Sequence, residues 1–235
     1  MSDRFSAALE QLERSGHRPE RLSEPFVTFL PITGAAVSTL GDVLGSETIS
    51  ATDARAARLD EIQFDLGEGP CWDAMLSAAP VSEPDVTAGA PARWPAFAEA
   101  LRGDPIRSIF AFPLVVGPLR LGAVDLYSLR PLHLDDTSSR RAESMAEIIG
   151  RHVLRGAVAA SESPAAEDAN PRSRRVVHQA TGVVLAQLAT PPDEALLIIQ
   201  AHAFATGRPM VEVATEILEG RLSFHRQGGR IEVAS

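Results

Sequence analysis

Residues 174–218 decide the fold of the C-terminal part of this chain, and they contain three segments: RRVVHQATGVVLAQL (174–188), PPDEALLIIQAHA (191–203) and GRPMVEVATEIL (207–218). Each segment places apolar side chains three and four positions apart, which is the spacing of one helix face. The expected stripes are, in order, Val176, Ala180, Val183 and Val184; Leu196, Ile199 and Ala203; and Met210, Val213, Ala214, Ile217 and Leu218. Helices this short are marginal alone, so we expect them to pack as a three-helix bundle.

The joints between these helices carry start and stop signals. Thr190 is expected to cap the second helix, with Pro191 in its first turn and Asp193 completing a capping box. Gly207 is expected to end that helix in the left-handed conformation, and Pro209 to start the third. The three helices therefore have well-marked ends.

Residues 172–223 resemble the ANTAR domain of bacterial transcription antiterminators. The matching residues are Gln179, Ala180 and Gly182 in the first helix, Asp193, Glu194, Ala195 and Ala203 in the second, and Val213, Ala214 and Ile217 in the third. ANTAR domains bind hairpins in nascent RNA. The resemblance therefore implies an RNA-binding antitermination regulator that acts in the context of elongating RNA polymerase and is not an enzyme, with no catalytic residue.

The polar and basic side chains of this segment are the candidates for RNA contact, and we expect fewer than half of them to touch RNA: Arg174, Arg175, His178, Gln179, Thr181, Gln200, His202 and Arg208. Two of these positions depart from the family pattern, because Thr181 stands where lysine is common and Gln200 where arginine is common. Both departures remove positive charge, which implies weaker binding or a narrower target. The alternative for each residue is a solvated surface side chain with no role in binding.

Charge is divided unevenly along the 235-residue chain, whose net charge is −9. Residues 1–171 carry 15 arginines against 25 acidic residues, whereas residues 172–235 carry 7 against 6. Because an acidic surface repels nucleic acid, the C-terminal segment is the part that suits a polyanionic partner. Residues 161–171 are polar and bracketed by prolines, and we expect them to form a linker.

Missing residue types exclude several classes of function. All 22 basic residues are arginines, so the chain has no phosphate-loop lysine, no Schiff-base lysine and no receiver domain of the usual kind. The single cysteine, Cys71, forms no internal disulfide, which fits a reducing cytoplasm. The six histidines lack zinc-ligand spacing, so we expect no metal and no cofactor. No segment has the length and apolarity of a membrane span, and we expect a cytoplasmic protein without a membrane partner.

Residues 1–160 alternate between helical and strand patterns. Helices are expected over 5–14, 19–30, 53–63, 70–79, 94–102 and 135–158, and strands over 35–40, 47–52, 80–83, 107–115 and 119–129. Strands collected into one antiparallel sheet with flanking helices make an α+β fold.

Two stretches of this part resemble GAF domains, namely GEGPCWDA (67–74) and LGAVDLY (121–127). The resemblance covers about residues 20–160. It implies a GAF-like sensory or dimerisation domain over 1–160, the linker over 161–171, the ANTAR domain over 172–223 and a flexible tail over 224–235. The candidates for lining a ligand pocket are Cys71, Trp72, Trp94, Phe112 and Tyr127. Whether the domain binds an unknown small molecule or serves only as a scaffold stays open.

Two alternative functions compete with RNA binding. A three-helix unit can form a DNA-binding helix-turn-helix, but Glu212, Glu216 and Glu219 on the third helix would repel phosphates. A GAF-type redox enzyme would use Cys71, which lacks a resolving cysteine. As a redox sensor, Cys71 would need a lowered pKa at a helix N-terminus, and a packed, unreactive thiol is the favoured interpretation.

We also expect a homodimer. Met145, Ile148, Ile149, His152 and Val153 form an apolar stripe on the helix 135–158, of the kind that joins two helices. The alternative is that this stripe covers the domain's own sheet.

Overall fold

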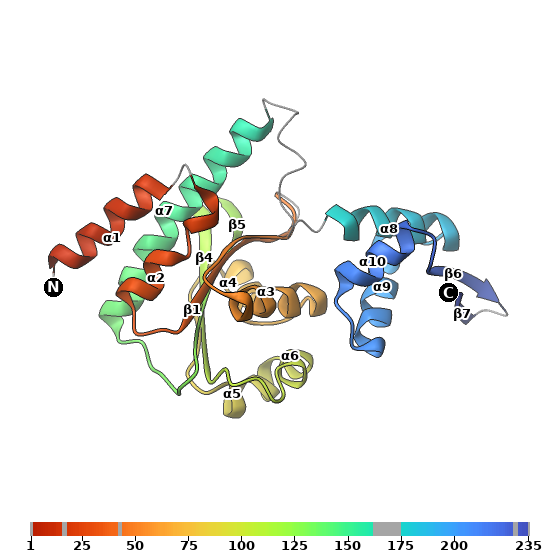
Figure 1. Cartoon of the computed structure of the whole chain (residues 1–235), viewed down its shortest axis with the longest axis horizontal. Helices are drawn as coiled ribbons and strands as arrows, with labels where there is room; N and C mark the ends of the chain where they lie inside the picture. Colours follow the sequence, from red (N-terminus) through yellow and green to blue (C-terminus); the bar gives the residue numbers. More distant parts are fainter. Residues whose placement is uncertain (1, 16–17, 42–43, 162–174, 228–229, 235) are drawn as a thin grey trace. The chain divides into compact units, whose positions relative to one another are not determined.

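The computed structural model describes residues 2–15, 18–41, 44–161, 175–227 and 230–234 (Figure 1). The chain divides into two compact units, Met1–Arg172 and Ser173–Ser235. Residues 162–171 of the expected linker, and Arg174, lie outside the described residues.

The first unit contains one antiparallel sheet. Its strands are β1 (Gly34–Thr39), β2 (Glu47–Ala51), β3 (Val81–Glu83), β4 (Ser108–Val116) and β5 (Leu119–Ser128). Their order across the sheet is β2-β1-β5-β4-β3, with every neighbouring pair antiparallel. The α+β class predicted from the sequence is therefore confirmed.

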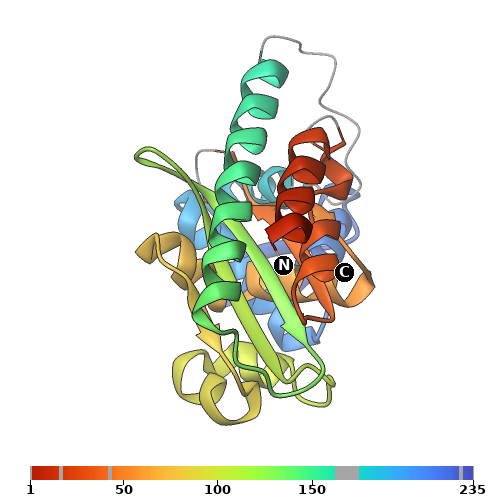
Figure 2. The same cartoon turned by 90° about the vertical axis from the view of Figure 1, so that its left-hand side faces the viewer.

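Helices cover both faces of this sheet. On one face lie α1 (Ser2–Ser15), α2 (Glu24–Phe29) and α7 (Asp136–Ser161). Figure 2 shows α7 lying across β4 and β5 with the red α1 beside it. The other side carries α3 (Ala54–Leu66), α4 (Pro70–Ser77), α5 (Val86–Arg93) and α6 (Pro95–Ala100), and the short helix η1 (Pro19–Arg21) precedes α2.

Alternation along β4 divides its side chains between two cores. Phe110, Phe112 and Leu114 pack on the α7 side, whereas Ile109 and Ala111 face the α3 side. This division follows from the two-residue period of a strand, which sends successive side chains to opposite faces.

The stripe of α7 that was expected to form a dimer interface is buried inside the first unit. Met145 and Ile149 are fully buried, and Ile148 and Val153 are each 8% exposed. All four belong to the core between α7 and the sheet, while His152 is half-buried. The expected interface is therefore wrong in its position, because α7 uses this stripe to cover its own sheet.

The second unit is a helical bundle followed by a hairpin. Its helices are α8 (Arg175–Leu188), α9 (Pro192–Thr206) and α10 (Met210–Leu218). The strands β6 (Ser223–Gln227) and β7 (Arg230–Ala234) pair antiparallel over a region that was expected to be a flexible tail. The hairpin is attached to the bundle by its first strand: Phe224 is 3% exposed, and its backbone N–H donates to the Gln187 side chain at 2.9 Å.

Four details of the bundle differ from the expected ones. Leu218, expected in the buried stripe of α10, is 39% exposed. The buried stripe of α8 contains Val177 in place of Val176 and Val183, and that of α9 contains Ala195 in place of Leu196. Pro191, not Thr190, precedes the first residue of α9 as its cap. Apolar residues in α8 and α9 spread beyond one helix face, so the spacing alone does not identify which of them are buried.

Candidate nucleic-acid interface and a buried acidic pair

Helix α8 presents a continuous exposed strip opposite its buried face. The strip consists of Arg175, His178, Gln179, Gly182 and Ala186, at positions i, i+3, i+4, i+7 and i+11. No acidic residue occurs anywhere in α8, and a side-chain carbon added to Gly182 would have no neighbour within 4 Å. The strip thus combines a cation and hydrogen-bonding groups with a centre of small residues. Such a surface allows a polyanion backbone to come close to the helix.

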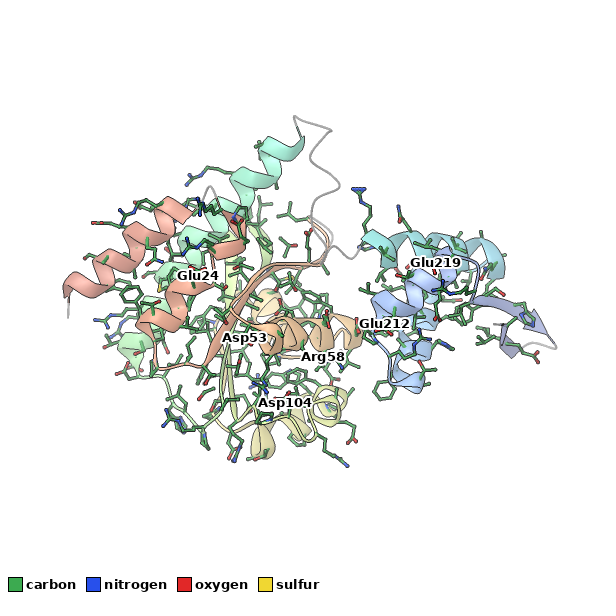
Figure 3. The ribbon with its side chains drawn as sticks, viewed as in Figure 1. Glu24, Asp53, Arg58, Asp104, Glu212 and Glu219 are labelled. Carbon is green, nitrogen blue, oxygen red and sulfur yellow. The ribbon has the colours of Figure 1, made fainter. Side chains whose placement is uncertain are left out.

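The exposed surfaces of the other two helices include acidic residues. The carboxylates there belong to Asp193 and Glu194 in the first turn of α9, Glu212 on α10, and Glu219 at its end (Figure 3). Each adds negative charge that would repel a phosphate. The electrostatics of the bundle therefore favour α8 as the face for nucleic acid.

Arg208 and His202, two of the predicted RNA-binding residues, contact side chains of other elements in the second unit. Arg208 lies 2.9 Å from Glu216 and 3.6 Å from Glu212, and its guanidinium holds the pKa of Glu216 below the ordinary range. The ring of His202 packs edge-on against Phe224 of the hairpin, with centroids 5.7 Å apart. The positive charge of Arg208 is therefore largely compensated where it stands.

The remaining predicted residues fall in different places. Thr181 lies off the strip, and its hydroxyl donates to the Val177 carbonyl at 2.8 Å. Gln200 is half-buried on α9. The structure thus brings Arg175, His178 and Gln179 together on one face and separates Thr181 from them.

A buried acidic pair lies between α3 and the sheet of the first unit. Asp60 of α3 and Asp125 of β5 are at most 1% exposed. The Thr48 hydroxyl donates to Asp60 Oδ2 at 3.0 Å, and the Gln63 amide donates to Asp125 Oδ2 at 2.8 Å. Both Oδ1 atoms lack a hydrogen-bond partner among the described residues. Burying two ionised carboxylate oxygens without hydrogen-bond partners would destabilise the fold by several kcal/mol. Protonation of the pair is therefore favoured.

Burial raises the pKa of both carboxyl groups. Burial, followed by the charge of Asp125, raises the pKa of Asp60 well above its usual range. Burial raises the pKa of Asp125 to about 7, against a lowering by its hydrogen bond from Gln63. The pair therefore holds at least one proton near neutral pH, and a proton shared between the two carboxyl groups satisfies acceptors that otherwise have none.

Gln63 connects this pair to the turn that follows α3. Its amide group donates to Asp125 and its side-chain oxygen accepts the backbone N–H of Cys71 at 2.8 Å, while the indole of Trp72 donates to its backbone carbonyl at 2.8 Å. A Cβ at Gly69 would lie 2.6 Å from the Gln63 side-chain oxygen, and the φ of Gly69 is +137°. The second glycine of the GEGPC motif is thus required by the packing of Gln63.

Cys71 is the second residue of α4 and is fully buried. Burial, followed by the charges of Asp125 and Asp60, raises the pKa of its thiol well above the usual range. The thiolate is the reactive form of cysteine, so the environment suppresses its reactivity. The raised pKa and the burial of the thiol therefore favour a packed thiol over the sensor and redox-enzyme interpretations.

The five ligand-pocket candidates do not gather in one place. Trp94 and Tyr127 belong to the core on the α3 side, and Cys71 packs with Trp72 in a smaller cluster. Phe112 lies in the core on the α7 side, across the sheet from the other four. Because of the strand period, Phe112 cannot line a pocket shared with them.

Sequence reasoning missed Asp60, Gln63 and Asp125, although signals were present. Asp125 interrupts the apolar run of residues 121–126, and its position within that run indicates burial. Asp60 and Gln63 lie on the same face of α3 as the buried Ala56. A polar residue within an apolar stripe could have been recognised as part of a buried network.

The fold defines a two-unit protein, with an α+β domain followed by a helical bundle. The GAF domain model matches residues 26–153, and the ANTAR domain model matches residues 168–218. The chain therefore belongs to the GAF family and carries an ANTAR domain after its GAF domain. This architecture is one of signal transduction and transcription regulation.

Solved GAF domains share the fold of the first unit. The GAF domain of an Acinetobacter phosphoenolpyruvate-protein phosphotransferase superposes with a TM-score of 0.52 at 8% identity, covering 66% of this chain and 93% of that one. The corresponding domain from Coxiella burnetii gives 0.51 at 12% identity, covering 67% and 96%. Identities this low show the fold alone. Among curated proteins, none matches the chain.

Within the described residues, no single helix has the length and apolarity to cross a membrane, and the one helix pair that would qualify by length and composition, α8 with α9, is bent by 107°. The same residues contain no group of three or more His, Cys, Asp or Glu side chains arranged to hold a metal ion.

Proposed function

We propose that the chain is an RNA-binding transcription antitermination regulator, whose ANTAR domain binds hairpins in nascent mRNA under the control of its GAF domain. The observation that carries this proposal is the exposed strip of α8. It lies in the ANTAR domain, contains no acidic residue and groups Arg175, His178 and Gln179 on one face. These side chains supply one phosphate contact and several hydrogen-bonding groups.

Single-stranded loops suit this strip better than a duplex does. Proteins read RNA sequence mainly at unpaired bases, whose edges accept and donate hydrogen bonds. His178 and Gln179 are exposed and offer such groups next to Arg175. The small residues Gly182 and Ala186 leave space for the RNA backbone along the helix.

DNA binding is the second candidate and has less support. In a helix-turn-helix arrangement the last helix enters the major groove. Here that helix is α10, which carries Glu212 and Glu216, with Glu219 directly after it. Carboxylates at these positions would oppose insertion between two phosphate backbones.

The experiment compares three full-length variants by equilibrium binding to a pool of RNA stem-loops. Gly182→Glu places an acid in the middle of the strip, where the added side chain meets open space. Arg175→Ala removes its cation. Leu218→Glu is the matched control, because it adds the same charge at an exposed position of α10.

We expect Gly182→Glu to lose RNA binding by at least tenfold and Arg175→Ala to weaken it across sequences by a few fold. Leu218→Glu should bind like the parent. Equal affinities for Gly182→Glu and the parent, with both folded by circular dichroism, would remove α8 from the interface. The small-molecule ligand of the GAF domain, the homodimer, the contact with elongating RNA polymerase and the cytoplasmic location stay predictions.

A further inference from the structure

The Asp60–Asp125 pair of the first unit takes no part in the proposed RNA binding. Both side chains are at most 1% exposed, and the Oδ1 atom of each lacks a hydrogen-bond partner among the described residues. Well-packed apolar side chains in place of buried charged groups are often as stable or more stable. Stability alone therefore does not account for two acids at this position, and the proton that they hold points to a use of its own.

The groups that face the pair from neighbouring elements are uncharged. Burial raises the pKa of Asp60, and the hydroxyl groups of Thr48 on β2 and Ser38 on β1 act in the opposite direction. The titratable group among these neighbours is the thiol of Cys71 on α4, whose pKa is raised by burial and then by the charges of both carboxyl groups. A hydroxyl or a protonated thiol cannot neutralise a second negative charge, so the pair depends on its proton.

Gln63 of α3 links the pair to the turn between α3 and α4. Its side-chain amide donates to Asp125 Oδ2 at 2.8 Å, and its side-chain oxygen accepts the backbone N–H of Cys71 at the same distance. The indole of Trp72 donates to its backbone carbonyl at 2.8 Å. A displacement of Gln63 therefore disturbs the start of α4 together with the pair.

The turn itself is built on two glycines in conformations that other residues rarely adopt. Gly67 ends α3 with a φ of +63°, and Gly69 has a φ of +137°. Because glycine has no Cβ, the backbone at these positions can rotate with little steric resistance. Between them, the Glu68 side chain accepts the backbone N–H of Phe97 at 2.8 Å, so a movement of the turn also reaches α6.

We propose that the Asp60–Asp125 pair is a proton-binding site through which the first unit senses pH. When the last shared proton leaves to solvent water, two carboxylates face each other at a depth that water does not reach, and they repel. The turn at residues 67–72 then opens on its glycines, and water hydrates the charges. The closed turn is the low-pH state and the open turn is the high-pH state. This inference concerns the first unit and does not rest on RNA binding.

The direction of the response follows from the raised pKa values. The pKa of Asp125 is raised by burial to about 7, and that of Asp60 is raised well above its usual range, mainly by burial. Coupled carboxyl groups release their protons in two steps that belong to the pair. The pair is therefore protonated below about pH 7, and the open turn gains population as the pH rises above that value.

The test is hydrogen–deuterium exchange of the full-length chain, followed by mass spectrometry at about pH 6 and about pH 9. Exchange of residues 67–74 is compared with that of residues 142–149 of α7, which pack on the opposite face of the sheet. Protection is expressed relative to the unfolded chain at the same pH, which removes the intrinsic effect of pH on exchange. Asp125→Asn removes one carboxylate of the pair, and Glu61→Gln is the matched control, a carboxylate of α3 that pairs with Arg58.

We expect the protection of residues 67–74 to fall at least about tenfold between the two pH values in the parent and in Glu61→Gln, and residues 142–149 to lose less. Asp125→Asn should keep the turn protected at both values, because one carboxylate alone has no like charge to repel it. If Asp125→Asn does not fold by circular dichroism, Asp60→Asn carries the same expectation.

Three results would overturn the proposal. The first is equal loss of protection at the turn and in α7 of the parent, which would mean that the proton acts on global stability alone. The second is constant protection of the turn in the parent, and the third is a parental fall in the folded Asn variant. Gly182→Glu leaves the pair intact, so its loss or retention of RNA binding decides the proposed function separately.

Discussion

Gly69 is a position at which a side chain would be both strained and crowded. Its φ of +137° is rare for residues with a side chain, and a Cβ there would lie 2.6 Å from the Gln63 side chain. We expect Gly69→Ala to lower the free energy of unfolding of the GAF domain by roughly 1–3 kcal/mol, because the change adds backbone strain and displaces Gln63 from Asp125. Urea denaturation of the full-length chain measures this change.

Gly182→Ala is the matched control with the opposite sign. Gly182 lies within α8, and a Cβ there would meet no neighbour. The substitution should stabilise the ANTAR domain by roughly 0.5–1 kcal/mol, since alanine restricts the unfolded chain more than glycine does. If both substitutions changed stability in the same direction, the assigned backbone environments would be incorrect.

The Asp60–Asp125 pair predicts an unusual pH dependence of stability. Both folded-state pKa values are raised above the value of an unfolded aspartate, about 3.9. The folded state therefore keeps protons that the unfolded state loses. This stabilisation is fully present below about pH 4 and is lost as the pH rises through the folded pKa, which is about 7 for Asp125. One such proton changes the free energy of unfolding by roughly 1.4 kcal/mol per pH unit.

Asp125→Asn tests this assignment by thermal unfolding between about pH 5 and pH 8. The amide can accept from Gln63 and donate to Asp60, so the stability of the variant should fall less steeply with rising pH than that of the parent. Glu61→Gln is the control, one position along α3 in an ion pair with Arg58. A parental slope in Asp125→Asn would show that the pair does not hold the proton.

At the scale of elements, the sequence predicted the strongly periodic segments best. The strands β4 and β5 and the helices α7 and α10 carry the clearest patterns. Helix α5 was missed, because Pro91 stands inside it and proline normally ends a helix. The hairpin of β6 and β7 was missed although Gly228 and Gly229 stand between its strands, and two glycines there are a strong hairpin signal.

The candidate site was predicted less well than the fold. The helical spacing of Arg175, His178 and Gln179 is enough to place them on one face of α8. Tertiary contacts determine the surroundings of Arg208 and His202. Arg208 pairs with Glu216 and His202 packs on Phe224, and both contacts join residues from different elements. Helical spacing carries no information about such contacts.

The modest charge of the α8 strip predicts a shallow salt dependence of RNA binding. One arginine of the strip, with the basic residues that precede it in the sequence, offers about two to four phosphate contacts. The logarithm of the association constant should therefore fall against the logarithm of salt concentration with a slope of roughly −1.5 to −3. Filter binding to a stem-loop pool at several salt concentrations measures the slope. A slope near −8 would require a basic surface far larger than α8.

At the scale of the whole molecule, the two domains differ in net charge. Residues 1–171 carry ten more acidic than basic residues, whereas residues 172–235 carry one more basic than acidic residue. Because an acidic GAF domain would repel RNA, the proposed RNA binding is assigned to the ANTAR domain.

The most direct test of RNA recognition is ultraviolet cross-linking of the full-length chain to RNA in its native host, followed by sequencing of the RNA recovered. Gly182→Glu, expressed at the same level, is the control. The account predicts that the parent recovers transcripts sharing stem-loops ahead of terminators, and that Gly182→Glu loses them. Recovery of the same transcripts by both proteins, or of none by either, would contradict it.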